Sequence, residues 1–217
     1  MTPNQITLLR VLMGFAAVAL FARNFWCDVA ALALTIAAIT LDALDGYLAR
    51  RRKLSTPLGA QLDILGDRVV ENLFFTFFAV TGLVSLWVPV LFFVRGASTD
   101  FLRSLAVRAG RAGFGTNSML QTWWGRALVA SRVSRAAYGT MKCLCFCYLG
   151  VELILIRLPA AALSPAQVAW VRAAAETLVL ATVAFCLIRA VPVLWEGRHY
   201  FSAASPAPSK IITSIAR

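Results

Sequence analysis

Five acidic side chains recur at helical spacing inside two apolar segments of this chain. Asp42 and Asp45 lie three residues apart near the end of the first segment. Asp63, Asp67 and Glu71 lie four residues apart near the start of the second. Residues three or four apart share one face of an α-helix, so each set forms a stripe of carboxylates. Because Mg²⁺ and Mn²⁺ prefer oxygen ligands, the spacing predicts a divalent-metal site that can also accept phosphate oxygens.

A structural role is the alternative explanation for these acids. Nearby cations could pair with them and hold helices together, and the cations available are Arg50, Arg68, Arg95 and Arg103. Ion pairing accounts readily for Glu71 and Asp100. It accounts less well for four aspartates, because surplus acid would remain in an apolar setting, where an Asp costs about 2.5–3.5 kcal/mol at the bilayer centre.

Other catalytic chemistries find little support in the sequence. The one histidine, His199, lies in a polar C-terminal segment, which nearly excludes a buried histidine base or a histidine-ligated metal. Cys143, Cys145 and Cys147 alternate, and residues two apart do not share a helical face. These cysteines are therefore predicted to be apolar packing residues. Acid–base chemistry, if present, must depend on carboxylates.

The composition indicates which elements carry these acids. Of 217 residues, 60% are hydrophobic and 14% are charged, which is typical of a polytopic membrane protein and not of a soluble or disordered chain. The net charge of +11 favours anionic lipid headgroups over nucleic acid as a partner. We therefore predict an all-α fold with six transmembrane helices. The six apolar runs are Ile6–Phe21, Val29–Leu48, Leu62–Ser85, Leu86–Val107, Ala127–Ile156 and Gln167–Val191.

The basic residues predict the orientation of this membrane domain. Arginine and lysine concentrate after the second and fourth runs and in the C-terminal segment, which share one side of the membrane if the spans number six. Both termini and the carboxylates are therefore expected to be cytoplasmic. The short loops and the lack of a basic leader before the first run suit a bacterial inner membrane. We predict a membrane domain over residues 1–195 and a loosely ordered cytoplasmic tail over 196–217.

The acidic stripes belong to a longer pattern, which reads Asp42-x2-Asp45-Gly46-x2-Ala49-Arg50-x8-Gly59-x3-Asp63-x3-Asp67. This pattern resembles the signature of the CDP-alcohol phosphotransferases, with all eight fixed positions present at the family spacing. The opening Pro3-Asn4…Thr7…Arg10 extends the resemblance more weakly. The resemblance implies a membrane enzyme, usually a homodimer, that transfers a phosphatidyl group from CDP-diacylglycerol to a small alcohol and releases CMP.

The same resemblance implies a role for each position of the motif. Two Mg²⁺ or Mn²⁺ ions would be held by Asp42, Asp45, Asp63 and Asp67. Asp67 would also act as the catalytic base on the acceptor hydroxyl. The residues that would contact the CDP moiety are Gly46, Ala49, Arg50 and Gly59, the small ones by allowing close approach and the arginine by neutralising a phosphate. Since no Ser–His or Cys–His pair is available, direct displacement is favoured over a covalent intermediate.

The acceptor alcohol is less sharply defined. Cations that could bind an acceptor phosphate, or the diphosphate, are Arg95, Arg103, Arg132, Arg135 and Lys142. They could instead pair with acids or extend to the headgroups. The isoleucine after Asp63 and the arginine after Asp67 look more like phosphatidylinositol or phosphatidylinositol-phosphate synthases than phosphatidylglycerophosphate synthases. A polyol or polyol phosphate of the inositol type is therefore slightly favoured, with glycerol 3-phosphate as the alternative.

Two functions from other classes remain open. Intramembrane carboxylates also line the paths of cation transporters, although acids clustered at one membrane face, without a visible internal repeat, argue against transport. A catalytically silent membrane scaffold could also retain the motif for stability.

Overall fold

The structure is a computed structural model that describes residues 3–52, 57–108, 119–159 and 162–199. Within these ranges, side chains are described except at positions 3, 42–52, 57–58, 60, 108 and 132. The described chain is helical and contains no strand, which confirms the all-α prediction. Its elements are α1 (Pro3–Leu20), α2 (Phe25–Arg52), α3 (Pro57–Val80), α4 (Trp87–Arg108), α5 (Trp123–Gly125), the π-helix η1 (Arg126–Ala130), α6 (Arg132–Ile156) and α7 (Pro165–Gly197).

The six long helices coincide with the six apolar runs of the sequence. Two of them, over Val133–Ile156 and Pro165–Gly197, are long and apolar enough to cross a membrane by themselves. Asn4–Leu20 and Phe25–Leu41 are apolar but shorter. Over their described residues, neither α3 nor α4 meets the same criterion of length, hydropathy and charge. The described helices thus identify two clear candidate spans, and the six-span topology stays a prediction.

Local capping explains several helix boundaries. The predicted continuous run Ala127–Ile156 is wrong at Ser131, which is extended (φ −65°, ψ 144°) and separates η1 from α6. Its side-chain oxygen accepts a hydrogen bond from the Ser134 amide at 3.1 Å, as an N-cap residue does. At the start of α7, Ser164 and Gln167 exchange side-chain to backbone bonds of 3.3 and 2.8 Å in a capping box. That helix continues to Gly197, past the end of the predicted run.

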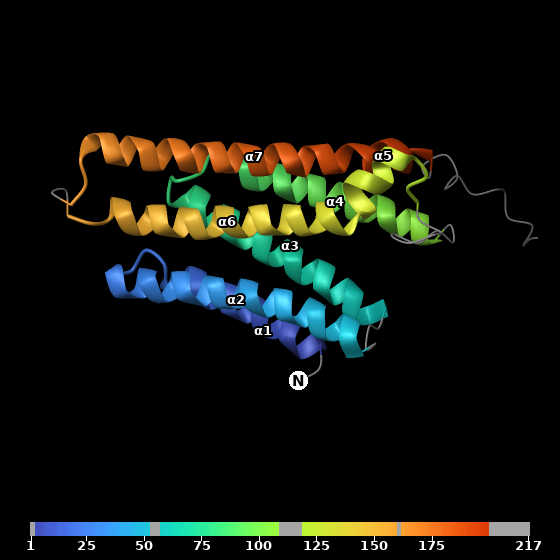
Figure 1. Ribbon diagram of the computed structural model, residues 1–217, viewed down its shortest axis with the longest axis horizontal. Helices are drawn as coiled ribbons and strands as arrows, with labels where there is room; N and C mark the ends of the chain where they lie inside the picture. The colour runs from blue at the N-terminus through green and yellow to red at the C-terminus, as the bar shows by residue number, and fades with distance from the viewer. Residues whose placement is uncertain (1–2, 53–56, 109–118, 160–161, 200–217) are drawn as a thin grey trace, which may run out of the picture. The chain divides into compact units, whose positions relative to one another are not determined.

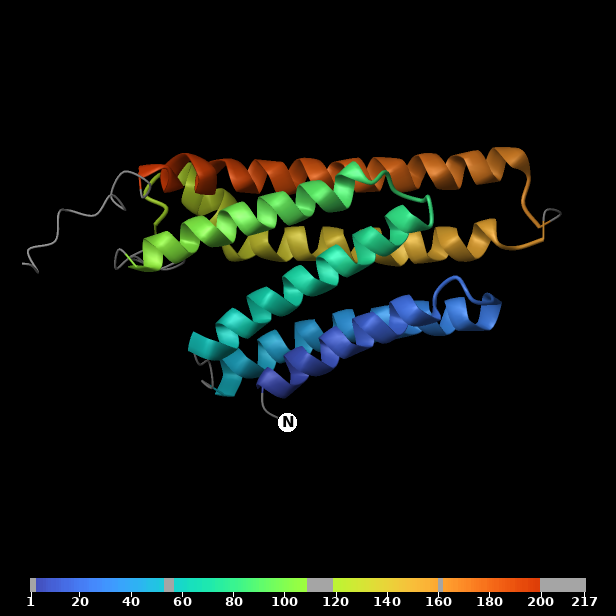
Figure 2. The same cartoon turned by 180° about the vertical axis from the view of Figure 1, so that it is seen from behind.

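The chain divides into two compact units, and each is described by itself. The first comprises Met1–Val94 and Ala137–Phe185, and the second comprises Arg95–Ala136 and Cys186–Arg217. In the first unit, α1 and α2 run antiparallel and side by side (Figures 1 and 2). Asp28 stabilises their connection, because its carboxylate accepts a 2.6 Å bond from the Ala22 amide and pairs with Arg157 at 2.9 Å.

Phenylalanine rings form the core of the first unit. Phe74, Phe75 and Phe78 of α3 are fully buried. The rings of Phe75 and Phe92 stack with centroids 4.3 Å apart, and those of Phe74 and Phe146 stack at 5.1 Å. Stacked pairs of this kind add to the area that the rings bury. They fix the position of α3 against α4 and α6, and so place the acidic start of α3.

The second unit is organised around two polar side chains of α7, the buried Arg189 and the half-buried Glu196. Arg189 donates to the carbonyls of Leu128 (2.7 Å) and Val129 (3.4 Å), at the break between η1 and α6. Glu196 accepts from the Thr122 backbone amide (3.4 Å) and from its hydroxyl. Beside them lies an apolar cluster made of Leu102, Ala106, Met119, Leu120, Val129 and Val193.

Candidate active site

The eight-position motif lies on the second half of α2 and the first half of α3. Five of its positions, Asp42, Asp45, Gly46, Ala49 and Arg50, are helical residues of α2 whose side chains lie outside the described residues. Gly59, Asp63 and Asp67 lie in α3. The helices confirm that each acidic pair shares one helical face. Their joint coordination of metal stays a prediction, as does the contact of Gly46, Ala49, Arg50 and Gly59 with CDP.

The two described aspartates are joined by a single arginine of α1. The Nη2 atom of Arg10 lies 3.1 Å from Oδ1 of Asp63, and Nη1 lies 3.0 Å from Oδ1 of Asp67. The arginine side chain is only 7% exposed, whereas the two carboxylates are 53% and 48% exposed. One planar guanidinium therefore holds two carboxylates one helical turn apart, and both remain accessible from solvent.

Arg10 is the site residue that the motif did not identify. It appears in the weaker opening of the resemblance, without a role. The signal that could have found it is a cation inside an apolar helix, because such residues usually pair with acids on a neighbouring helix. The partner could not be chosen from sequence, since Arg10 and Asp63 lie 53 positions apart.

A glycine sets the approach of α1 to α3 at this point. A Cβ atom at Gly66 would lie 3.0 Å from Cγ2 of Thr7 and 3.3 Å from Nη2 of Arg10. Any side chain there would displace α1 or the guanidinium. Gly66 directly precedes Asp67 in α3. Its lack of a side chain therefore allows Arg10 to pair with both aspartates.

Gly66→Ala should lower the free energy of unfolding by about 1–3 kcal/mol, because overpacking a close helix contact forces a shift. The matched control is Gly139→Ala in α6, where a Cβ atom meets nothing within 4 Å. That change should be neutral or should stabilise the helix by up to about 1 kcal/mol. Thermal unfolding in detergent measures both, and equal melting temperatures for the two variants would contradict the tight contact.

The third acid of the α3 stripe, Glu71, is a buried ion-pair partner. Its Oε2 atom lies 2.9 Å from Nζ of Lys142 and 3.6 Å from Nη1 of Arg68, and its side chain is 2% exposed. Asp100 pairs with Arg103 at 3.0 Å within the second unit. Ion pairing is thus confirmed for both acids, and it joins two helices at Glu71 but lies within α4 at Asp100. The α3 stripe separates into two accessible acids and one internal acid.

Glu71→Gln should lower the free energy of unfolding by about 3–5 kcal/mol, because it leaves the Lys142 ammonium buried without its counter-ion. Adding Lys142→Met should recover part of the loss, since both charges then leave together. Glu176→Gln is the control, because Glu176 belongs to an exposed i,i+4 pair whose loss costs about 0.5 kcal/mol or less. Denaturant unfolding of the four proteins measures these differences, and a Glu71 effect no larger than the Glu176 effect would refute the buried pair.

The proposed acceptor cations fall in different parts of the chain. Lys142 lies in the first unit and pairs with Glu71. Its Nζ atom also lies 4.8 Å from the centre of the Tyr138 ring. Arg95, Arg103 and Arg135 lie in the second unit, and the side chain of Arg132 lies outside the described residues. The pairing alternative holds for Lys142 and Arg103. A common anion site formed by all five cations stays a prediction.

The metal prediction can be assessed from the donors present. In the described part of the chain, no group of three or more His, Cys, Asp or Glu side chains is close enough to hold an ion. The cysteines there are free, and Cys145 and Cys186 are buried, in keeping with packing roles. Asp63 and Asp67 do fit a divalent ion chemically, because they are accessible carboxylates on one helical face.

Comparison with known proteins identifies the class. A family model described as CDP-alcohol phosphatidyltransferase matches residues 1–204. The chain belongs to the CDP-alcohol phosphatidyltransferase family. This assignment confirms the resemblance carried by the eight-position motif.

Individual relatives are similar over a shorter stretch. A CDP-diacylglycerol–glycerol-3-phosphate 3-phosphatidyltransferase of Pseudomonas fluorescens is 45% identical over 69 residues, which are 31% of this chain and 35% of the relative. An enzyme of the same name from Cereibacter sphaeroides is 41% identical over 70 residues, or 31% of this chain and 32% of the relative. A cardiolipin synthase (CMP-forming) of Oryza sativa subsp. japonica is 38% identical over 73 residues, 31% of this chain and 21% of the relative. The chain thus matches about a third or less of the length of these relatives.

Proposed function

We propose that this chain transfers the phosphatidyl group of CDP-diacylglycerol to a hydroxyl of glycerol 3-phosphate and releases CMP. Membership of the family supports the reaction class. The acceptor rests on the names of two relatives, which specify glycerol 3-phosphate. These names favour the alternative acceptor of the sequence analysis over the inositol type. The observation that carries the proposal is the accessible pair of motif aspartates, Asp63 and Asp67, which share the guanidinium of Arg10 in α1.

Each motif residue has a role in this proposal. The carboxylates that would hold two Mg²⁺ or Mn²⁺ ions are Asp42, Asp45, Asp63 and Asp67. When bound, the ions supply positive charge that stabilises the attacking and leaving oxygens of the transferred phosphate. Gly46, Ala49 and Gly59 leave space beside the backbone for the CDP moiety, and Arg50 neutralises phosphate charge.

The chain's own chemistry centres on Asp67. Its carboxylate accepts the proton of the acceptor hydroxyl as the oxygen of that hydroxyl bonds to the phosphorus nearest diacylglycerol. The bond from that phosphorus to the CMP oxygen breaks, and CMP leaves with the bonding electrons. A carboxylate is a weak base, so alignment of the two substrates supplies much of the acceleration. Arg10 keeps the Asp67 carboxylate oriented on its helical face.

The proposal includes the setting of the enzyme. Relatives of this family are membrane enzymes, and the acyl chains of the donor must stay in the bilayer while CDP stays in water. We place the motif at the cytoplasmic edge of a bacterial inner membrane, with both termini cytoplasmic and with the chain as a homodimer.

An acceptor screen tests the proposal. Purified protein would be given CDP-diacylglycerol, Mg²⁺ or Mn²⁺, and one of glycerol 3-phosphate, inositol, inositol phosphate or serine. We expect CMP release that requires metal and is fastest with glycerol 3-phosphate, with phosphatidylglycerophosphate identified by mass spectrometry. Faster turnover with an inositol compound would contradict the assignment of glycerol 3-phosphate as the acceptor. Metal flux into proteoliposomes without any CMP would instead favour a transporter.

A further inference from the structure

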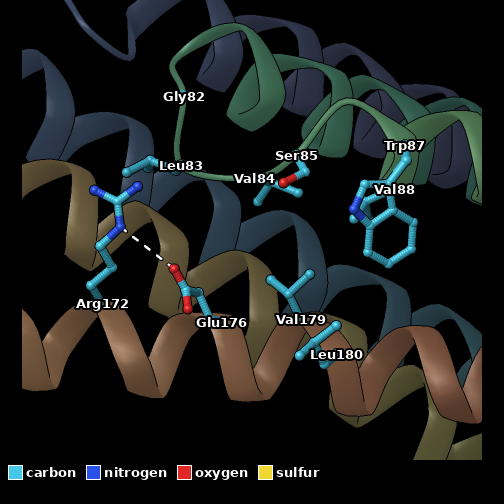
Figure 3. A pocket seen from close by; sticks show the side chains of 10 residues that line it. All are labelled: Gly82, Leu83, Val84, Ser85, Trp87, Val88, Arg172, Glu176, Val179 and Leu180. Atoms are coloured by element: carbon cyan, nitrogen blue, oxygen red, sulfur yellow. Dashed lines mark ion pairs between the residues drawn. The ribbon is translucent and has the colours of Figure 1, made fainter.

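A cavity of about 410 Å³ lies in the first unit, away from the motif. The loop between α3 and α4 forms one wall and a stretch of α7 forms the other (Figure 3). Its volume is in the range of small-ligand sites. The cavity opens to the exterior of this unit and is not enclosed.

The cavity is far from the aspartates. It begins just beyond Val80, where α3 ends, and Asp63 lies 17 residues earlier in the same helix. At the helical rise per residue, this separation is about 26 Å. That length is close to the thickness of a bilayer's hydrocarbon core, about 30 Å. The cavity therefore lies at the end of the helices opposite the motif.

An arginine forms the polar rim of the cavity. Nε of Arg172 lies 3.6 Å from Oε1 of Glu176, one turn along α7. Figure 3 shows the two terminal nitrogens of Arg172 pointing away from Glu176, toward Leu83 of the loop. Ser85 contributes a hydroxyl to the same cavity. Its Nε atom faces Glu176 in an exposed ion pair, and both terminal nitrogens point toward the loop, so the guanidinium of Arg172 can bind a phosphate through two N–H groups.

The rest of the cavity is apolar. Val179 and Leu180 follow Arg172 by seven and eight residues, so they lie on the same face of α7 two turns further along. Val84 and Val88 face them from the other wall. The lining thus changes from a cation at one end to hydrocarbon at the other, in the order that a phospholipid presents its phosphate and its acyl chain.

Exposed tryptophans mark this end of the first unit as a membrane interface. Trp26, at the start of α2, and Trp170, near the start of α7, are each 78% exposed. Tryptophan concentrates at the level of the headgroups, where its ring is partly apolar and partly wet. Because Arg172 follows Trp170 by two residues in α7, its guanidinium is expected near the depth of the lipid phosphates.

We infer that this cavity binds a phospholipid of the leaflet opposite the catalytic motif, with the lipid phosphate on Arg172 and an acyl chain along Val179 and Leu180. Glu176 orients the arginine and touches no lipid. The Arg172–Glu176 pair is well exposed, so the guanidinium is accessible to a lipid phosphate at the rim of the cavity.

Native mass spectrometry of the purified full chain tests this inference. The protein in mild detergent would be titrated with dioleoyl phosphatidylglycerol, and the bound lipids counted. We expect Arg172→Gln to retain one phospholipid fewer than the parent, with an apparent affinity for that lipid at least ten-fold weaker. Arg23→Gln is the matched control, because Arg23 is exposed in the α1–α2 connection and does not line the cavity. It should bind like the parent.

Three further measurements distinguish a bound phospholipid from a neutral lipid and from a free anion. Dioleoylglycerol has the same chains without phosphate and should show no difference between parent and Arg172→Gln. Leu180→Trp fills the apolar end without changing charge and should also lose the lipid, so the inference stays testable if Arg172→Gln does not fold. Equal lipid counts for the parent and both cavity variants would overturn the inference. So would displacement of the lipid by an equal concentration of glycerol 3-phosphate, which would indicate a site for free anions.

Discussion

Asp67→Asn should lower the rate of CMP release by about 10²–10⁴-fold, the range that a positioned general base contributes. Asparagine has the shape of aspartate but cannot take the proton of the acceptor hydroxyl. The Asp67 side chain is 48% exposed and lies at the chain's surface beside Arg10, so the fold should survive the change. The measurement is initial CMP release from CDP-diacylglycerol with saturating glycerol 3-phosphate and Mg²⁺.

Arg23→Gln provides the control for this prediction, because it changes an exposed charged residue in the α1–α2 connection, outside the motif and outside the cavity. It should leave turnover unchanged. Circular dichroism and thermal unfolding should show that Asp67→Asn remains folded. A folded Asp67→Asn protein with the turnover of the parent would exclude Asp67 as the base and direct attention to the other motif acids.

Arg10→Gln should lower kcat/KM by about 10–100-fold and raise the Mg²⁺ concentration needed for half-maximal rate, because groups that orient metal ligands have effects of this size. Without the guanidinium, the two carboxylates lose their common partner and repel each other. Arg10→Lys should restore little, since one ammonium cannot span both Oδ1 atoms as the planar fork does. Mg²⁺ titrations of initial rate measure the change.

A purely structural role for Arg10 makes a different prediction. It would lower the melting temperature of the variants but leave the Mg²⁺ dependence of the surviving activity where it is in the parent. Arg23→Gln is again the control for loss of one positive charge, and its Mg²⁺ titration should match that of the parent. An unchanged titration for folded Arg10→Gln would refute the positioning role.

Much of the fold follows from features that are local in the sequence. A run of apolar residues long enough for a helix identifies itself, and each of the six runs contains most of one long helix. Capping is equally local, as in the Ser164–Gln167 box. The break at Ser131 was missed because the apolar residues on either side were joined across a short polar stretch, Ser131, Arg132, Ser134 and Arg135, and the serine's cap bond is not visible in hydropathy.

The second unit shows what hydropathy does not encode. Arg189 and Glu196 would be read as charges in or near the end of an apolar helix. In the structure they satisfy backbone groups at Leu128 and Thr122, more than 60 positions earlier. Irregular backbone within an apolar protein needs such partners, because an unsatisfied buried polar group is costly. Which charged residue serves which break depends on chain packing.

By itself, the sequence determined the all-α class, the family and the identities of the candidate acids. Composition, run length and an eight-position motif are local properties, and no folding is needed to see them. Only tertiary structure decided how the acids differ in environment. Asp63 and Asp67 share Arg10 because a glycine lets α1 lie against α3, whereas Glu71, one turn further, is buried against Lys142 of α6. The same spacing thus yields accessible and internal carboxylates, since burial depends on which helix packs against each turn.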